Sequence, residues 1–311
     1  MANGVASPEA TGGAGTIFEY RVAALAMSRL LRGAHPPVGP HRPIVGVALQ
    51  QRVAGSLLDD VVMRAGSTDL STIIEFQVKK TLSVTGSSTE LVSVLGQAME
   101  TWQSRAHDLE SGRLILGVAA GGPEDELKDL AQLSSMARSH HTSASFRLLL
   151  SEHVTRRQLR SRFEHVVTAL TEAASLTQRT EAEIQAHRVL SRLHVWTVDP
   201  SEDGRDWRQG LDDARALAHA GGMTADDLLG KLAQLAQSIG PHAGNMDADA
   251  IRASFRSKFA VDLSATAPPP HGITINARHE GSGSMIVGQT MTFHGLTINT
   301  HIPGNPPTSG A

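Results

Sequence analysis

The stretch STIIEFQVKK, residues 71–80, alternates apolar and polar side chains and decides how the rest of the chain is interpreted. In a β-strand, successive side chains point to opposite faces of the sheet. Glu75, Gln77 and Lys79 would therefore share one face, and the apolar residues between them would face a core. An ordinary half-exposed strand shows the same alternation, so a functional interpretation needs a second feature.

The second feature is an acidic pair inside an apolar run. LLDDVVMR, residues 57–64, carries Asp59 and Asp60 in a segment that otherwise reads as a strand. Aspartate disfavours both strands and burial, so the pair carries a cost that a bound cation or a basic partner could offset. If this strand pairs with the next one in a meander, Asp60 lies near Gln77 and Lys79 at a sheet edge.

The surrounding patterns predict a mixed α/β domain. Apolar periodicity and turn residues indicate a helix at 16–33, strands at 44–51, 57–64 and 72–80, a helix at 88–109 and a strand at 113–120. Beyond these we expect a helix from Pro123, strands at 145–151 and 193–199, and helices from about 206 to 260. The order of the first six elements is helix, three strands, helix, strand.

Composition excludes several classes of protein. The chain has 311 residues, of which 40% are hydrophobic, which is enough to bury a substantial core. It has no cysteine, which excludes disulfides, thiolate metal sites and thiol catalysis. No apolar run approaches the roughly 18 residues of a membrane span, and the first residues lack a signal-peptide pattern, so we expect a cytoplasmic protein without a membrane partner.

Three motifs in this order resemble the PD-(D/E)xK restriction-endonuclease-like superfamily. They are G-x-x-[FY]-E at 15–19, DDVV at 59–62 and FQVKK at 76–80. Together they resemble the double-stranded DNA nuclease domain of bacterial anti-phage effectors, including the CD-NTase-associated endonucleases. The resemblance covers about residues 12–200 and extends more faintly to about 260.

The resemblance implies a fold and a division of the chain. The expected fold is a restriction-endonuclease-like core of helix, three-strand meander, helix and strand, with a helical C-terminal extension and a Gly-rich, β-prone tail. The implied segments are a disordered leader (1–11), the nuclease domain (12–200), a helical extension (201–262), and a linker and tail (263–311) containing the repeats HGITIN and HGLTIN.

The resemblance also implies a magnesium- or manganese-dependent endodeoxyribonuclease that hydrolyses phosphodiester bonds of double-stranded DNA. Asp60 would be a metal ligand, with Asp59 as its rival, and Lys79 would be the catalytic lysine. Gln77 stands where the superfamily often has Asp or Glu, and its amide offers the metal only a carbonyl oxygen.

A neutral amide ligand leaves a divalent ion short of negative charge, so a further carboxylate is needed. Glu19 on the first helix and Glu75 on the third strand are the two candidates. We favour Glu19, because Glu75 is one two-residue repeat, about 7 Å, from Gln77 along the strand. An ordinary surface acid on the first helix remains the alternative for Glu19.

Basic residues could bind the DNA backbone. Arg156 and Arg160 lie four residues apart, on one helix face, with Arg157 beside them, and Lys80 follows the catalytic lysine. Phosphate contacts of this kind would weaken with salt. A solvated helix surface explains the arginines equally well.

The tail and the missing third carboxylate leave two function classes open. The repeats faintly resemble short amyloid-signalling motifs, which would recruit the nuclease to a sensor NTPase or another assembly partner. A dimer is expected, because cutting both DNA strands usually needs two sites. The alternative is a catalytically inactive, nuclease-like adaptor that binds a partner or nucleic acid and assembles through its tail.

Overall fold

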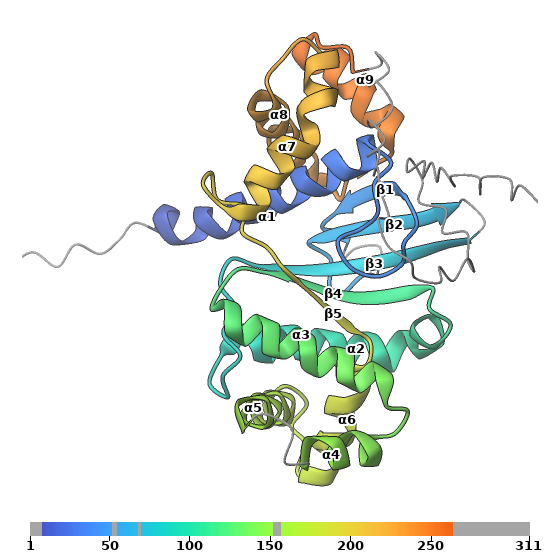
Figure 1. The fold of residues 1–311 in the computed structure, drawn as a ribbon, viewed down its shortest axis with the longest axis vertical. Coiled ribbons are helices and arrows are strands. Elements are labelled where there is room, and N and C mark those ends of the chain that lie inside the picture. Colours follow the sequence, from blue (N-terminus) through green and yellow to red (C-terminus); the bar gives the residue numbers. More distant parts are fainter. Residues whose placement is uncertain (1–7, 52–54, 68–69, 152–156, 264–311) are drawn as a thin grey trace, which may run out of the picture.

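The computed structural model describes residues 8–51, 55–67, 70–151 and 157–263 (Figure 1). The first half of the described chain contains α1 (Pro8–Leu31), β1 (Ile44–Leu49), β2 (Val61–Ser67), β3 (Leu70–Lys79), α2 (Thr89–Glu110) and β4 (Leu114–Ala120). The second half contains α3 (Glu124–Ser139), α4 (Ser143–Ser151), α5 (Arg157–Ala173), α6 (Arg179–Leu190), β5 (Leu193–Thr197), α7 (Arg205–Ala220), α8 (Ala225–Ile239), η2 (Gly240–His242), β6 (Asn245–Met246) and α9 (Ala248–Phe259).

The strands form one mixed, six-stranded sheet in the order β5-β4-β3-β2-β1-β6. β1, β2 and β3 are antiparallel neighbours, which confirms the predicted meander. β3, β4 and β5 run parallel to one another, so their carboxyl ends meet at the same edge of the sheet. The predicted order of helix, three strands, helix and strand is confirmed, and the protein is of the α/β class.

The structure corrects three details of the sequence analysis. Residues 145–151, predicted as a strand, belong to helix α4. β2 begins at Val61, so Asp59 and Asp60 lie in the segment before the strand and not inside it. The predicted position at a sheet edge is also wrong, because β2 and β3 are inner strands and the acids lie at a strand end.

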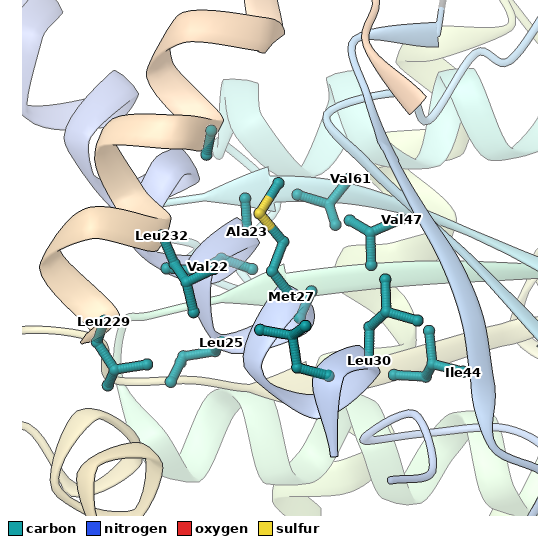
Figure 2. Close-up of a cluster of buried hydrophobic side chains, with 14 of the residues drawn as sticks. Val22, Ala23, Leu25, Met27, Leu30, Ile44, Val47, Val61, Leu229 and Leu232 are labelled. Carbon is teal, nitrogen blue, oxygen red and sulfur yellow. The ribbon is translucent and has the colours of Figure 1, made fainter. Parts of the chain in front are cut away.

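A hydrophobic core covers each face of the sheet. On one face, α1 packs with α7, α8 and α9 against Val47, Val61 and other inward residues of β1 to β3. Figure 2 shows the centre of this core, where Met27 of α1 lies among residues of β1, β2 and α8. Helices α2 to α6 form the second core with β4 and β5 on the opposite face.

The residues after 200 therefore share the core of the sheet. Leu229 and Leu232 of α8 are fully buried and belong to the same cluster as Val22 of α1. Figure 1 shows α7, α8 and α9 gathered along α1, above the strands in that view. The helical extension thus closes one face of the sheet.

Local sequence explains where the main helices begin and end. Seven consecutive residues of α1, from 22 to 28, are buried, because this helix lies between the sheet and the later helices. α1 is followed by Gly33 at a φ of +63°, a left-handed conformation that glycine adopts without strain. α2 begins after Ser88, whose side chain accepts a hydrogen bond from the Leu91 amide, 3.2 Å away.

Some sequence predictions concern residues outside the described part of the chain. Residues 1–7 of the predicted leader and the tail from 264 onward, with both hexapeptide repeats, are outside it, whereas residues 8–11 belong to α1. The side chain of Arg156 is also outside it. Within the described residues, we find no helix with the length and apolar character needed to cross a membrane.

Candidate active site

Asp60 lies immediately before β2 and is bound to β3. Its Oδ2 accepts hydrogen bonds from Gln77 Nε2 at 2.5 Å and from the Val78 amide at 2.7 Å. The register explains this contact, because Val61 pairs with Phe76 and Val62 with Glu75, which sets Asp60 opposite Gln77. The predicted approach of Asp60 to Gln77 is therefore observed.

Lys79 follows Gln77 by two residues and shares its face of β3, and its charge reaches both Asp60 and Glu19. Burial raises the pKa of Asp60 to about 6, although the Val78 amide and the Lys79 charge oppose this shift. Burial also raises the pKa of Glu19 to about 7, with a further increase from Asp60 and a decrease from Lys79. Two carboxyls and one amine thus converge at the carboxyl end of β3.

Gln77 contributes an oxygen that has no partner. The residue is only 6% exposed, and its Nε2 is used by Asp60. Its Oε1 is buried and accepts no hydrogen bond from the described residues. A buried carbonyl oxygen without a donor is costly unless something else binds it.

Glu75 faces the same side as Gln77 but is engaged elsewhere. It is 1% exposed, and its Oε1 accepts hydrogen bonds from Ser56 Oγ at 2.9 Å and from Arg105 Nη1 at 2.5 Å. Burial raises the pKa of Glu75, and the Arg105 hydrogen bond lowers it. Of the two carboxyls considered as the additional acid, Glu19 is the one whose pKa responds to Asp60.

Asp59 lies close enough to influence all these acids. Its charge raises the pKa of Glu19, of Asp60 and of Glu75, after the larger effect of burial in each case. Asp59 therefore stays the rival ligand to Asp60. The Asp60 side chain accepts two hydrogen bonds from β3.

The residues that could hold a divalent cation are Asp60 and Gln77, with Glu19 as the nearby acid. Oxygen atoms of carboxylates and amides are the ligands that Mg²⁺ prefers, and the unsatisfied Oε1 of Gln77 fits that role. Among the residues that the structure describes, no group of three or more His, Asp or Glu side chains is arranged to hold a metal ion.

The predicted DNA-binding residues that the structure describes come from two elements, the end of β3 and the start of α5. Lys80 is exposed at the end of β3, beside Lys79. Arg157 is exposed at the first position of α5, and Arg160 is partly exposed one turn later. Farther along α5, Arg162 Nη1 donates to the Val84 carbonyl at 2.9 Å, which attaches this helix to the loop after β3.

Sequence reasoning missed the residues that hold this region in place. Arg105 reaches Glu75 from α2, across 30 positions in the chain, and adopts a non-helical φ of −133° there. Arg21 of α1 bonds to Glu202, across 181 positions. No local pattern indicates such pairs, because a lone arginine on a helix is ordinarily a surface residue.

Comparisons with known proteins show no family for this chain. No protein-family model matches the chain, and neither does any curated protein. Among solved structures, the chain is similar to a SAVED/CARF-domain-containing Cap4 receptor of Moraxella osloensis, with 9% sequence identity and a TM-score of 0.41. The alignment covers 86% of this chain and 53% of the receptor, so the chain spans about half of the receptor's length. The site must be interpreted from its own residues.

Proposed function

We propose that the protein is a metal-dependent DNA endonuclease with a restriction-endonuclease-like core. The observation that carries the proposal is the contact of Asp60 with Gln77, beside Lys79 and Glu19, at the end of β3. A buried acid, an amide oxygen and a lysine on one strand end are the groups that phosphodiester hydrolysis with a divalent cation requires. The antiparallel meander followed by a parallel strand is consistent with the proposed core.

The residues of the chain would have distinct tasks. Asp60 and the Oε1 of Gln77 would hold a Mg²⁺ or Mn²⁺ ion, with Glu19 or Asp59 supplying further negative charge. A bound ion of this kind polarises a phosphate and lowers the pKa of a nearby water. Lys79 would donate to a phosphate oxygen, where it stabilises the negative charge that develops during hydrolysis. The raised pKa of Glu19 lets this carboxyl exchange a proton near neutral pH.

The substrate and the setting follow from the motif resemblance. Double-stranded DNA would be the substrate, and Lys80 is the basic residue best placed to contact its backbone next to Lys79. A bacterial anti-phage effector, acting in the cytoplasm as a dimer or larger assembly, is the role that the resemblance favours. The tail would connect the nuclease to a sensor NTPase or an amyloid-type signalling partner.

A cleavage assay tests the enzymatic proposal. Supercoiled plasmid is incubated with the full chain and Mg²⁺ or Mn²⁺, beside Asp60→Asn and Lys79→Met variants. We expect metal-dependent nicking and linearisation, and a loss on the order of 100-fold in each variant, the typical effect of removing one group that stabilises the transition state. Arg113→Ala, which replaces a 58% exposed arginine just before β4, is the matched control and should cleave normally.

Wild-type cleavage rates in both site variants would refute the assignment of these residues. Circular dichroism of each variant establishes that the fold is kept, so that a loss of activity is not a loss of structure. Absence of cleavage by the wild-type chain on plasmid, linear and phage DNA would remove the enzymatic proposal.

A second function is favoured by a specific observation. Oδ2 of Asp60 is already occupied by two internal hydrogen bonds, and no group of three acidic or histidine side chains suited to a metal occurs in the described part of the chain. A nuclease-like adaptor that catalyses no reaction would need the internal hydrogen bonds of Asp60 but no metal site. Binding of DNA or a partner that is insensitive to EDTA, with no cleavage, would favour the adaptor.

A further inference from the structure

A pocket of about 700 Å³ lies beside the candidate active site, at the carboxyl ends of three parallel strands. Lys80 lines it from the end of β3, Gly121 and Gly122 from the end of β4, and residues 197–201 from the end of β5. The remaining wall comes from α1 and from the first residues of α3 and α7. Small-molecule pockets typically enclose about 300–1,000 Å³, so this volume suits a mononucleotide.

The topology explains why the pocket is open. After β4 the chain enters α3, which packs in the core shared with α2, whereas after β5 it crosses to α7, which packs with α1 (Figure 1). Adjacent parallel strands whose connections leave toward opposite faces create a crevice at their carboxyl ends. Ligands of open α/β sheets bind at such a crevice.

Two glycines allow the loops at the pocket to pack closely. A Cβ atom on Gly121 would lie 2.6 Å from the Lys80 carbonyl oxygen, and one on Gly122 would lie 2.6 Å from the Leu82 carbonyl oxygen. Gly122 also has a φ of +138°, which side chains rarely permit. Gly121 therefore lets the end of β4 pack directly against the Lys80 backbone, and Gly122 does the same for the Leu82 backbone.

The lining combines an apolar wall with three cations, Arg21, Lys80 and Arg205, and two acids, Glu124 and Asp199. Ile17 is 56% exposed although it is a large aliphatic residue, and Phe18 lies next to it in the same wall. Arg21 and Arg205 also line the pocket, but they form ion pairs with Glu202 and Glu124. Lys80 has no ion-pair partner within the described ranges, so its amine is available to an anion.

We propose that this pocket binds one nucleotide, with its base against Ile17 and Phe18 and its phosphate at Lys80. Aromatic and aliphatic side chains stack bases without sequence preference, and a lysine supplies the point charge for a phosphate. The proposal rests on the proposed function, in which this nucleotide is the neighbour of the one whose phosphate Lys79 contacts. Lys79 is the last residue of β3 and Lys80 follows it directly, so the two lysines would contact neighbouring phosphates of one DNA strand.

The test is a calorimetric titration of the full chain with deoxyadenosine 5′-monophosphate in EDTA. We expect binding with a Kd of about 1 mM or tighter, and weaker binding of deoxyadenosine or of inorganic phosphate alone. Lys80→Ala should weaken binding about tenfold, because it removes the contact with the phosphate. Ile17→Ser should weaken binding about fivefold, because it removes an apolar contact with the base. Lys258→Ala, which changes a lysine of α9 outside the pocket, is the matched control and should bind normally.

No detectable binding at several millimolar, or equal affinity in both pocket variants and the wild type, overturns the proposal. The titration contains no divalent metal and measures no cleavage, so its outcome is independent of the enzymatic assay. Plasmid cleavage without mononucleotide binding would refute the proposed nucleotide pocket and leave the proposed endonuclease function standing. Mononucleotide binding without plasmid cleavage would support the pocket and refute the endonuclease function.

Discussion

At the scale of single residues, the site is defined by acids that the fold makes difficult to ionise. Burial raises the pKa of Asp60 to about 6 and that of Glu19 to about 7. Carboxyls with strongly shifted pKa values beside a lysine are a common property of functional sites. Near neutral pH these buried carboxyls lower the free energy of unfolding, because they ionise more readily in the unfolded chain.

The first prediction concerns the dependence of stability on pH. Between the unfolded pKa of Glu19, 4.5, and its folded value of about 7, the folded state binds more protons than the unfolded state. The free energy of unfolding should therefore fall as pH rises through this window. Because Glu19 is partly exposed and solvent screens its interactions, we expect a contribution of about 1 kcal/mol.

Urea denaturation at pH 5 and pH 8 measures this effect. Wild-type protein should lose more stability than Glu19→Gln between the two pH values, because the amide cannot ionise. Identical pH profiles for the two proteins would contradict the burial of Glu19 beside Asp60.

The second prediction concerns Arg105, which bonds to the almost completely buried Glu75. Arg105→Ala would leave this carboxylate without its cation, and we expect a loss of about 2 kcal/mol in the free energy of unfolding at pH 8. At pH 5 the loss should be smaller, because Glu75 can then take up a proton. Arg113→Ala, which removes an exposed ion pair with Asp108, should change stability by less than about 0.5 kcal/mol.

The sequence predicted part of this residue-scale arrangement. The alternation in residues 71–80 predicted that Gln77 and Lys79 share a face, and the acidic pair in an apolar run predicted an acid near them. It could not predict that Ser56 and Arg105 would engage Glu75, because those contacts depend on a loop and a helix that approach only in the folded chain.

At the scale of elements, the misassigned segment 145–151 illustrates a limit of periodicity. Its apolar run has the length of a strand, and such a short run fits a buried strand or a helix equally well. In α4 the buried residues are Phe146 and Leu150, four positions apart, whereas Leu148 is 66% exposed. Packing of the helix against α5 and α6, which no local pattern reveals, decides between the two.

The third prediction compares two glycines in neighbouring helices. A Cβ atom on Gly210 of α7 would lie 2.5 Å from Leu25 Cδ2 of α1, so Gly210→Ala should destabilise the protein by about 1–3 kcal/mol. A Cβ atom on Gly230 of α8 would meet no other atom within 4 Å among the described residues. Gly230→Ala should therefore stabilise the protein by about 0.5–1 kcal/mol through helix propensity.

Thermal denaturation of both variants measures the difference. Equal effects of the two substitutions would mean that α7 does not pack on α1 as described. The pair is informative because the chemical change is the same in both helices and only the surroundings differ.

At the scale of the whole molecule, the chain after residue 200 completes one of the two cores that cover the sheet. Trp207, Leu228 and Phe255 come from three different helices, and all belong to the core of α1 and β1 to β3. The sequence indicated helices in this region but not which surface they cover. Their attachment depends on pairs about 180 positions apart, such as Arg32 with Asp213, which lie beyond any local pattern.

The fourth prediction follows from this shared core. A fragment that ends at residue 200 exposes the apolar face of α1, so we expect it to aggregate or to lose fixed tertiary structure. A fragment that ends at residue 263 keeps α7 to α9 and should fold like the full chain. Near-UV circular dichroism and size-exclusion chromatography distinguish the two, and a well-folded monomer ending at residue 200 would contradict the shared core.

The central claim is that Asp60 and Gln77 bind a divalent cation, and a crystal grown with Mn²⁺ tests it most directly. Anomalous diffraction locates manganese independently of any structural assumption. We expect a peak within about 2.0–2.5 Å of an Asp60 carboxylate oxygen and of Gln77 Oε1, the range of ordinary oxygen coordination. A crystal saturated with Mn²⁺ that shows no peak there, or manganese only at other residues, would contradict the claim.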